Sequence, residues 1–265
     1  LRDALHYLRP GGRVAVVVVT ALEPTVEELL DDPNVKVLFR RAWSGHTVLH
    51  YQFSGAVDQA AGAGEKALER GVYHRGDMRL SLRKLEFPIE TAYGLPEFDT
   101  LSYRSQLLLE GVVSIQGSAA RCALLFNPGQ GHVPVAVWKL MKPGQLVLVD
   151  RDLLSLRYSR NNLILNKCPA SHVTLSHQVG LLAKDQQQAD LIIGNLREDE
   201  GPEGVALTMT QAAERLAPDG TILVTASSTA VTRLQRLIRA ERLLRIKKRK
   251  RSKGNSLLVL GPSAS

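Results

Sequence analysis

Short apolar runs alternate with amphipathic stretches over the second half of the chain. The apolar runs predict strands at 123–126, 146–149, 173–176 and 190–193, and the stretches between them predict helices at 134–141 and 153–165. Continuous apolar strands that alternate with helices indicate a parallel sheet covered on both faces. Ligands bind such sheets at the carboxyl ends of the strands, so the loops that follow these strands are the first places to look for chemistry.

A pattern of helix, turn and apolar strand occurs twice along the chain. The turn Pro10-Gly11-Gly12 leads into the apolar run 14–19, and the turn Pro218-Asp219-Gly220 leads into the run 222–225. Each copy is followed by a predicted helix, a basic strand and a closing strand, at 24–30, 35–41 and 47–53 and at 230–244, 244–251 and 256–260. Strands joined by short turns pair antiparallel, so each copy is predicted to end at an antiparallel sheet edge.

The two copies differ in what precedes them. A series of strands and helices comes before the second copy, whereas the first copy stands at the start of the sequence. We infer two related domains: residues 1–54 as the C-terminal remnant of a truncated first domain, residues 55–70, rich in Ala and Gly, as a linker, and residues 71–265 as a second domain. The alternative is chance similarity, since helix–turn–strand units are common in α/β proteins.

Composition limits the class of protein more than its function. The 265 residues, 44% of them hydrophobic, suffice for one large domain or two of average size. The sequence has no apolar run long enough to span a membrane and no signal peptide, so we expect a soluble, cytoplasmic protein without a membrane partner. Cys122 and Cys168 lack partners at ligand spacing, so neither a disulfide framework nor a metal site is expected. Trp43 and Trp138 are interpreted as core anchors, and the oligomeric state stays open.

The positive charge is concentrated in one segment. The chain carries a net charge of +8, and residues 233–253 hold eleven Lys or Arg against one Glu, so the remainder sums to −2. Five cations follow one another on the predicted edge strand: Lys247, Lys248, Arg249, Lys250 and Arg251. They are candidates for contact with RNA phosphates. Equally, they fit a solvated edge that lysine and arginine protect from pairing with other chains.

Two strand ends carry the candidate ligand-binding residues. The loop Asn127-Pro128-Gly129-Gln130-Gly131 follows the first strand, where glycines allow close approach of the backbone and the next helix begins with free N–H groups. Asp150 ends the second strand, where a carboxylate can accept hydrogen bonds from ribose hydroxyls. Asp150 could instead cap the following helix, in competition with Asp152. His132 and His177 have no partner at a diagnostic spacing and are interpreted as ordinary surface or loop histidines.

Several stretches together resemble the methyltransferase small-domain family, in particular the ribosomal RNA guanine-N2 methyltransferases with two tandem Rossmann-type domains. They are the glycine loop, Val149-Asp150, the Pro218 turn, Gly71-Val72-Tyr73, Ser105-Gln106-Leu107-Leu108-Leu109, Asn161-Asn162-Leu163 and Asp190-Leu191-Ile192-Ile193-Gly194-Asn195. The resemblance covers most of residues 71–260. It implies a Rossmann-like α/β fold, with a mostly parallel seven-stranded sheet and an antiparallel edge strand, and it makes residues 1–54 the remnant of a similar domain.

The resemblance also implies roles for individual residues. S-adenosylmethionine (SAM) would be the cofactor, held by Asn127, Gly129, Gly131 and Asp150, and RNA would be the partner. Asn195 would orient the substrate amine as the first residue of the family's Asn-Pro-Pro-aromatic motif. Arg197 could stack on a base, the alternative being a solvated loop residue.

The sequence departs from the family motifs in both loops. Leu125 and Asn127 stand where the family has an acid and a glycine, and Leu196-Arg197-Glu198 stands where it has Pro-Pro-aromatic. The acidic cluster 198–200 would repel RNA phosphates at the pocket mouth. Two functions are therefore carried forward: a SAM-dependent methyltransferase of RNA, of the guanine-N2 type, and a non-catalytic RNA-binding or scaffolding protein that keeps the fold, with residues 233–253 as its working surface.

Overall fold

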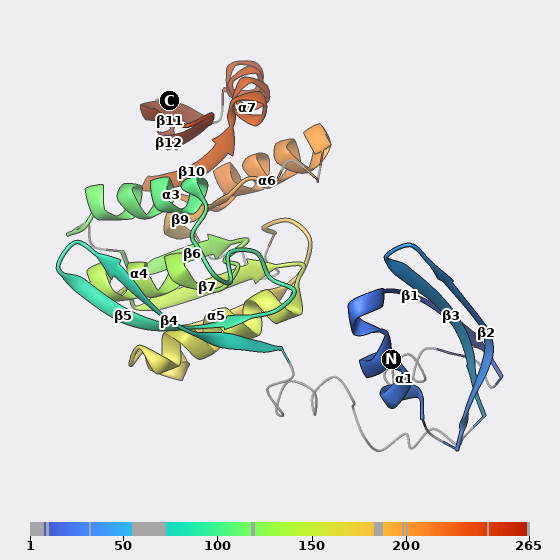
Figure 1. The fold of residues 1–265 in the computed structure, drawn as a ribbon. Helices are drawn as coiled ribbons and strands as arrows, with labels where there is room; N and C mark the ends of the chain where they lie inside the picture. The colour runs from blue at the N-terminus through green and yellow to red at the C-terminus, as the bar shows by residue number, and fades with distance from the viewer. Residues whose placement is uncertain are drawn as a thin grey trace. The chain divides into compact units, whose positions relative to one another are not determined.

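The structure is a computed structural model of the 265-residue chain, and it describes residues 8, 11–31, 33–54, 73–117, 120–182, 188–197, 199, 201–242 and 244–263. The chain divides into two compact units, Leu1–Tyr73 and His74–Ser265 (Figure 1). The predicted linker 55–70, the stretch Gly71-Val72, and Pro10 of the first repeat lie outside the described residues.

The first unit is a three-stranded antiparallel sheet with one helix on it. Its elements are β1 (Arg13–Val19), a short 3-10 turn (Thr20–Leu22), α1 (Glu23–Leu30), β2 (Val35–Trp43) and β3 (His46–Phe53), and the strand order is β1-β3-β2. Leu49 and Tyr51 alternate along β3 and pack with Leu30 of the helix. The interpretation of Trp43 as a core anchor is wrong: its side chain is 49% exposed at the end of β2, with the Arg41 guanidinium over its ring.

The second unit contains the predicted seven-stranded sheet, with strand order β11-β12-β10-β9-β6-β7-β8. Its strands are β6 (Cys122–Phe126), β7 (Gln145–Asp150), β8 (Val173–His177), β9 (Ala189–Asn195), β10 (Leu216–Ser227), β11 (Leu244–Ser252) and β12 (Asn255–Pro262). The strands from β10 to β8 are parallel, whereas β12 pairs antiparallel with β10, and β11 with β12. The predicted fold class is confirmed.

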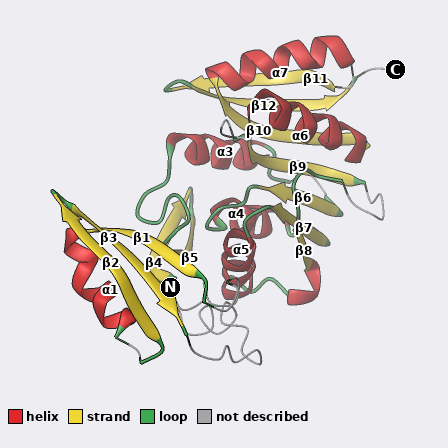
Figure 2. Cartoon of the chain, turned by 90° about the vertical axis from the view of Figure 1, so that its right-hand side faces the viewer, coloured by secondary structure: helices red, strands yellow, loops and turns green. Residues whose placement is uncertain are grey.

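Helices cover both faces of this sheet (Figure 2). They are α3 (Tyr103–Ser114), α4 (His132–Met141), α5 (Leu153–Leu165), α6 (Gly201–Arg215) and α7 (Ser228–Glu241), with a 3-10 turn at Ala170–His172. Alternation along each strand separates two cores: Leu125 faces the cluster that includes α3, α4 and α5, and Leu124 faces the cluster that includes α6 and α7. Among the described residues no helix is long and apolar enough to cross a membrane.

A hairpin that the sequence pattern did not reveal precedes this sheet. Strands β4 (His74–Leu82) and β5 (Leu85–Ala92) pair antiparallel, and β5 buries Phe87 and Ile89 in the core that contains α5. Asn162 of α5 donates to the carbonyl of Glu90 at 2.8 Å and accepts from its N–H at the same distance. The hairpin is therefore fixed against the helix that borders the glycine loop.

The repeated sequence pattern corresponds to a repeated arrangement of elements. In both units a strand, a helix, a basic strand and a closing strand follow one another, and the closing strand lies between the other two, as β1-β3-β2 and as β10-β12-β11. The basic strand carries a register shift in each, between Val37 and Phe39 and between Ile246 and Lys248. This correspondence supports the proposal of two related domains.

Candidate functional site

The glycine loop is shaped by packing against its own domain. Asn127, Gly129 and Gly131 all have positive φ, and a Cβ on Gly131 would lie 2.8 Å from the Cα of Ser159. Close approach of α5 therefore requires glycine at position 131. The buried Gln130 amide donates to the carbonyls of Ala92 and Pro96, both at 3.1 Å, which ties the loop to the end of β5.

A pocket of about 460 Å³ opens beside this loop, at the carboxyl ends of the parallel strands. It brings together four of the predicted site residues: Asn127, Gly129, Asn195 and Arg197. The segment 96–105 and the β11–β12 turn complete its wall, chiefly through Glu97, Tyr103, Arg104 and Asn255. Gly131 and Asp150 are not part of its lining.

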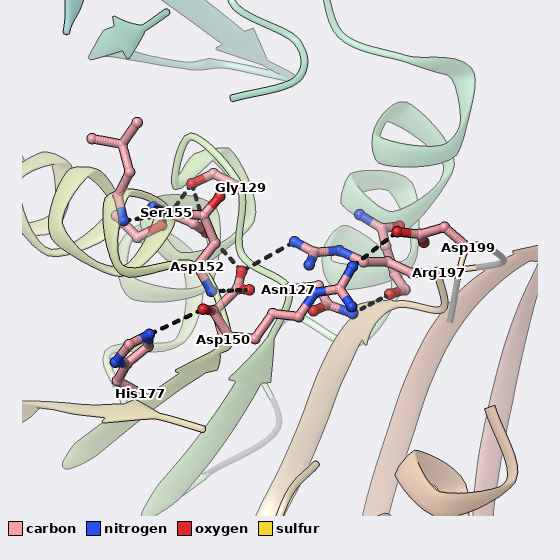
Figure 3. Close-up of polar contacts among 12 residues, drawn as sticks. Asn127, Gly129, Asp150, Asp152, Ser155, His177, Arg197 and Asp199 are labelled. Atoms are coloured by element: carbon pink, nitrogen blue, oxygen red, sulfur yellow. Dashed lines mark hydrogen bonds and ion pairs between the residues drawn. The ribbon is translucent and has the colours of Figure 1, made fainter. Parts of the chain in front are cut away.

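The carboxylate of Asp150 is fully buried and bonded within the protein. One oxygen accepts from the backbone N–H of Asp152 at 3.0 Å, and the other accepts from the Ser155 hydroxyl at 2.8 Å. That second oxygen also lies 3.3 Å from Nη2 of Arg197, whose side chain is 23% exposed (Figure 3). The cap of α5 is Asp152, which accepts from the N–H groups of residues 154 and 155. Asp150 is thus free of the capping role, but it is paired with Arg197.

The acceptors at the end of β9 are also engaged. Oδ1 of Asn195 accepts from the Thr225 hydroxyl on the neighbouring strand. The Asn195 carbonyl accepts from the Asn127 side-chain amide at 2.9 Å, and the next carbonyl, of Leu196, accepts from Arg104 at 3.1 Å. Three acceptors that could hold an incoming amine therefore already have donors from the protein.

The acidic cluster predicted after Arg197 is described only at Asp199. Its carboxylate lies 2.9 Å from the Arg151 guanidinium, and both side chains are largely exposed. Glu198 and Glu200 lie outside the described residues.

The five cations of β11 do not form one surface. Lys247 stands at the register shift, and beyond it Lys248 and Lys250 point to the face of the sheet that α3 covers, whereas Arg249 and Arg251 point to the other face. Lys250 Nζ lies 2.6 Å from a carboxylate oxygen on α3.

Arg249 is the least available of these five cations. Its guanidinium donates to the Ser256 hydroxyl at 3.2 and 3.3 Å, and burial, with a smaller contribution from Arg251, lowers its pKa. An arginine remains charged in spite of this shift. The edge strand therefore offers a different set of cations on each face.

The interpretation of His132 as an ordinary surface or loop histidine is wrong. It is the first residue of α4, it lines the pocket, and it is only 2% exposed. Its Nε2 has no hydrogen-bond partner, and burial lowers its pKa to about 4, so the ring is neutral at physiological pH. Its place directly after the glycine loop was the available signal, because the first turn of that helix faces the pocket. Among the described residues no cluster of His, Cys, Asp or Glu could hold a metal ion.

A family model described as "Methyltransferase small domain" matches residues 91–249. The chain belongs to the methyltransferase small-domain family. This family has the class I SAM-methyltransferase fold, in agreement with the sheet order described above.

Solved structures share this fold at low sequence identity. The T. thermophilus 16S rRNA N2 G1207 methyltransferase RsmC, in complex with AdoMet and guanosine, matches with a TM-score of 0.65 and 16% identity over 97% of this chain and 66% of that one. The ribosomal protein L11 methylase from Lactobacillus delbrueckii subsp. bulgaricus matches with a TM-score of 0.53 and 19% identity over 61% of this chain and 79% of that one. This chain thus spans about two thirds of the T. thermophilus protein. No curated protein sequence matched.

The family's cofactor can be tested against the residues of this site. Between the ends of β6 and β7 and the segment after β8, beside Asp150, the remaining cavity measures only about 20 Å³. Such a volume holds about one water molecule, not a nucleoside. Arg197 also pairs with Asp150, so the carboxylate that the family resemblance assigns to the ribose is occupied by a protein donor. In this structure the residues assigned to SAM therefore do not share one cavity: Asn127 and Gly129 line the pocket of about 460 Å³, whereas Asp150 lies outside it and is paired with Arg197.

Proposed function

We propose that this member of the methyltransferase small-domain family binds RNA and has kept the fold without methyl transfer. The observation that carries this proposal is the contact of Arg197 with the buried Asp150 carboxylate. Methyl transfer needs a cofactor held in line with an amine and acceptors that bind the amine's hydrogens. In this chain the ribose-binding acid and the amine acceptors all bond to protein donors.

The free energy needed to separate Arg197 from Asp150 follows from the burial of the carboxylate. The side chain of Asp150 is 0% exposed, so withdrawing Arg197 would leave a buried carboxylate without its counter-charge. Breaking a buried ion pair typically costs about 3 to 5 kcal/mol, and less where one partner is partly exposed, as Arg197 is. Separating Arg197 from Asp150 would therefore cost a cofactor about 2 kcal/mol of its binding free energy. That cost corresponds to a roughly thirtyfold larger dissociation constant.

The RNA-binding half of the proposal rests on charge. The chain has a net charge of +8 that arises from residues 233–253, and four of the five successive cations on β11 are exposed. Cations on an edge strand can follow a phosphate backbone without reading its sequence. Ribosomal RNA is the partner that the family resemblance suggests, and a cytoplasmic location remains a prediction.

Calorimetric titration of the intact chain with SAM and with its demethylated product tests the proposal. We expect no heat of binding for either compound from a folded sample that retains RNA on a filter. Binding of SAM with a micromolar dissociation constant would contradict the non-catalytic assignment. Absence of RNA retention at low salt would contradict the RNA-binding half.

A second candidate is a SAM-dependent methyltransferase that acts on the N2 amine of guanine in ribosomal RNA. The observation in its favour is that Asn195 and the glycine loop line the same pocket, at the ends of the adjacent strands β9 and β6. In this reading Asn127, Gly129, Gly131 and Asp150 hold the cofactor, and Asn195 orients the amine. Arg197 would then have to leave Asp150 before the cofactor binds.

The variant Arg197→Ala separates the two candidates. If the protein is a methyltransferase, removal of the guanidinium should tighten SAM binding, and Asp150→Ala in the same background should abolish that gain. If the fold is non-catalytic, Arg197→Ala should bind no SAM, because the cavity beside Asp150 stays too small. Arg121→Ala is the control, since Arg121 is exposed and pairs with Asp190 at the amino ends of β6 and β9, away from the pocket and from the cavity beside Asp150.

A further inference from the structure

An aromatic ring lies at the pocket in a place where the family motif does not put one. The motif after Asn195 has lost its aromatic residue, but Tyr103, the first residue of α3, lines the pocket and is 53% exposed. Its position is fixed by the helix cap: the hydroxyl of Ser102 accepts from the backbone N–H of Ser105 at 3.2 Å. The ring therefore stands on a rigid element with much of its surface open to solvent.

The basic strand reaches this ring through its hairpin turn. Lys253 and Gly254 form the turn between β11 and β12, both with positive φ, and Nζ of Lys253 lies 3.7 Å from the centroid of the Tyr103 ring. A cation over an aromatic face is attracted by the ring quadrupole. The turn thus places a positive charge directly above the ring.

Two further contacts hold the hairpin against α3. Arg104 Nε donates to Oδ1 of Asn255 at 3.4 Å, and Lys250 pairs with Glu110 at 2.6 Å. Together with Lys253 over Tyr103, these contacts hold the turn end of the hairpin against α3. The α3-facing side of the basic strand, near its turn, therefore adjoins the pocket.

We propose that Tyr103 is a stacking platform for an unpaired RNA base, and that Lys253 moves from the ring to a neighbouring phosphate when the base arrives. The inference rests on the RNA binding proposed above. Bases in a duplex stack on one another and cannot cover a side chain, so the ligand is a single-stranded nucleotide. Tyrosine stacks on any base, and the phosphate contact keeps Lys253 paired after it leaves the ring.

The pocket beside the ring can receive the edge of such a base. Its volume of about 460 Å³ exceeds what a single base needs, and the Glu97 carboxylate is part of its lining. The Glu97 carboxylate is held in place by the Ser105 hydroxyl at 2.8 Å and by the N–H of Ser102 at 3.2 Å. A preorganised carboxylate can accept from amino or imino groups of a base.

Titration of a single-stranded RNA oligonucleotide that contains 2-aminopurine tests the inference, because stacking quenches the fluorescence of this base. We expect Tyr103→Leu to weaken binding by roughly tenfold or more and to abolish the quenching, while Tyr103→Phe keeps both. Tyr93→Leu is the matched control. Tyr93 is 51% exposed and lies under an arginine, Arg75, but it does not line the pocket.

The charge above the ring is tested by salt dependence. Lys253→Gln should reduce the slope of log Kobs against log salt by about 0.7, the value for one phosphate contact on a single strand. Lys84→Gln, in the exposed two-residue turn between β4 and β5, should leave the slope unchanged.

The outcomes separate this inference from the function on which it rests. If the wild-type protein retains no RNA, the proposed function fails and this inference fails with it. If the wild type binds but Tyr103→Leu binds equally well, with unchanged quenching, only the stacking platform is overturned. Because Tyr103 is exposed, unchanged thermal unfolding of both Tyr103 variants will show that lost binding is not lost folding.

Discussion

Arg197 and Asp150 meet across the carboxyl edge of the sheet, with Nη2 of the arginine 3.3 Å from the buried Oδ2 of the aspartate. The two residues come from different loops, one after β9 and one at the end of β7. By the family resemblance, the first position would belong to the substrate motif and the second would meet the cofactor's ribose. The Arg197 side chain therefore connects the two halves of the site that the resemblance implies.

This ion pair should appear as coupling in a double-mutant cycle. Arg197→Ala and Asp150→Asn should each lower the free energy of unfolding by about 1 to 3 kcal/mol, and the double variant should lose less than the sum by about 0.5 to 2 kcal/mol. Urea unfolding of the four proteins measures this difference. Additive losses would show that the two groups do not interact in solution, and the closed-site argument would lose its basis.

The two glycines of the loop should respond differently to alanine. At Gly131 a Cβ would meet the backbone of Ser159 at 2.8 Å, whereas at Gly129 it would meet nothing within 4 Å. Both have positive φ, so each substitution carries about 1 kcal/mol of backbone strain. We expect Gly129→Ala to lose about that amount and Gly131→Ala to lose at least 1 kcal/mol more, as measured by urea unfolding. Equal losses would mean that α5 gives way at Ser159.

Much of the fold could be predicted because its strands are strongly apolar. The predicted strand 146–149 became Gln145–Asp150, and the predicted helix 153–165 has the same bounds in the structure. The hairpin β4–β5 was missed although residues 85–90 alternate apolar and polar positions, a pattern typical of a half-buried strand. Gly76 in β4 and Pro88 in β5 weaken this signal. The helix predicted to reach residue 244 ends at Glu241, where Arg242 adopts positive φ.

The place of the site could be predicted from the sequence, but the contacts that its polar groups make could not. Sequence order placed Asn127 and Asn195 at strand ends, and the structure brings them to one pocket. Nothing in the spacing of Asp150 and Arg197 indicates that they pair, because they are 47 residues apart and meet only through the order of the strands. The contact of Lys253 with Tyr103 could not be predicted for the same reason, because these residues are far apart in sequence and meet only where the β11–β12 hairpin packs against α3.

Burial of His132 predicts an acid-sensitive fold. Its pKa is about 4 in the folded protein and near 6.5 in the unfolded chain. Between these two pH values His132 is protonated in the unfolded chain but neutral in the folded protein. The contribution of His132 to the free energy of unfolding is therefore fully present above pH 6.5 and falls as the pH drops toward 4. The loss approaches about 3 kcal/mol. Urea unfolding between pH 7 and 4 should show this slope in the wild type and in the control His177→Gln, and a flatter one in His132→Val. Parallel slopes in all three would assign the acid sensitivity to other groups.

The division of β11 into two faces predicts unequal effects of charge removal on RNA binding. Lys248 and Lys250 lie on the face of α3, which carries Tyr103, whereas Arg249 on the other face is partly buried and bonded to a serine. The double variant Lys248→Gln/Lys250→Gln should therefore weaken binding of single-stranded RNA severalfold more than Arg249→Gln/Arg251→Gln, although both remove two charges. Filter binding over a range of salt concentrations makes the comparison, with a salt slope that falls by about 1.4 for the first pair. Equal effects would indicate that RNA binds along the edge of β11 and that only the total charge of the strand matters. The proposed RNA path from β11 to the pocket would then be contradicted.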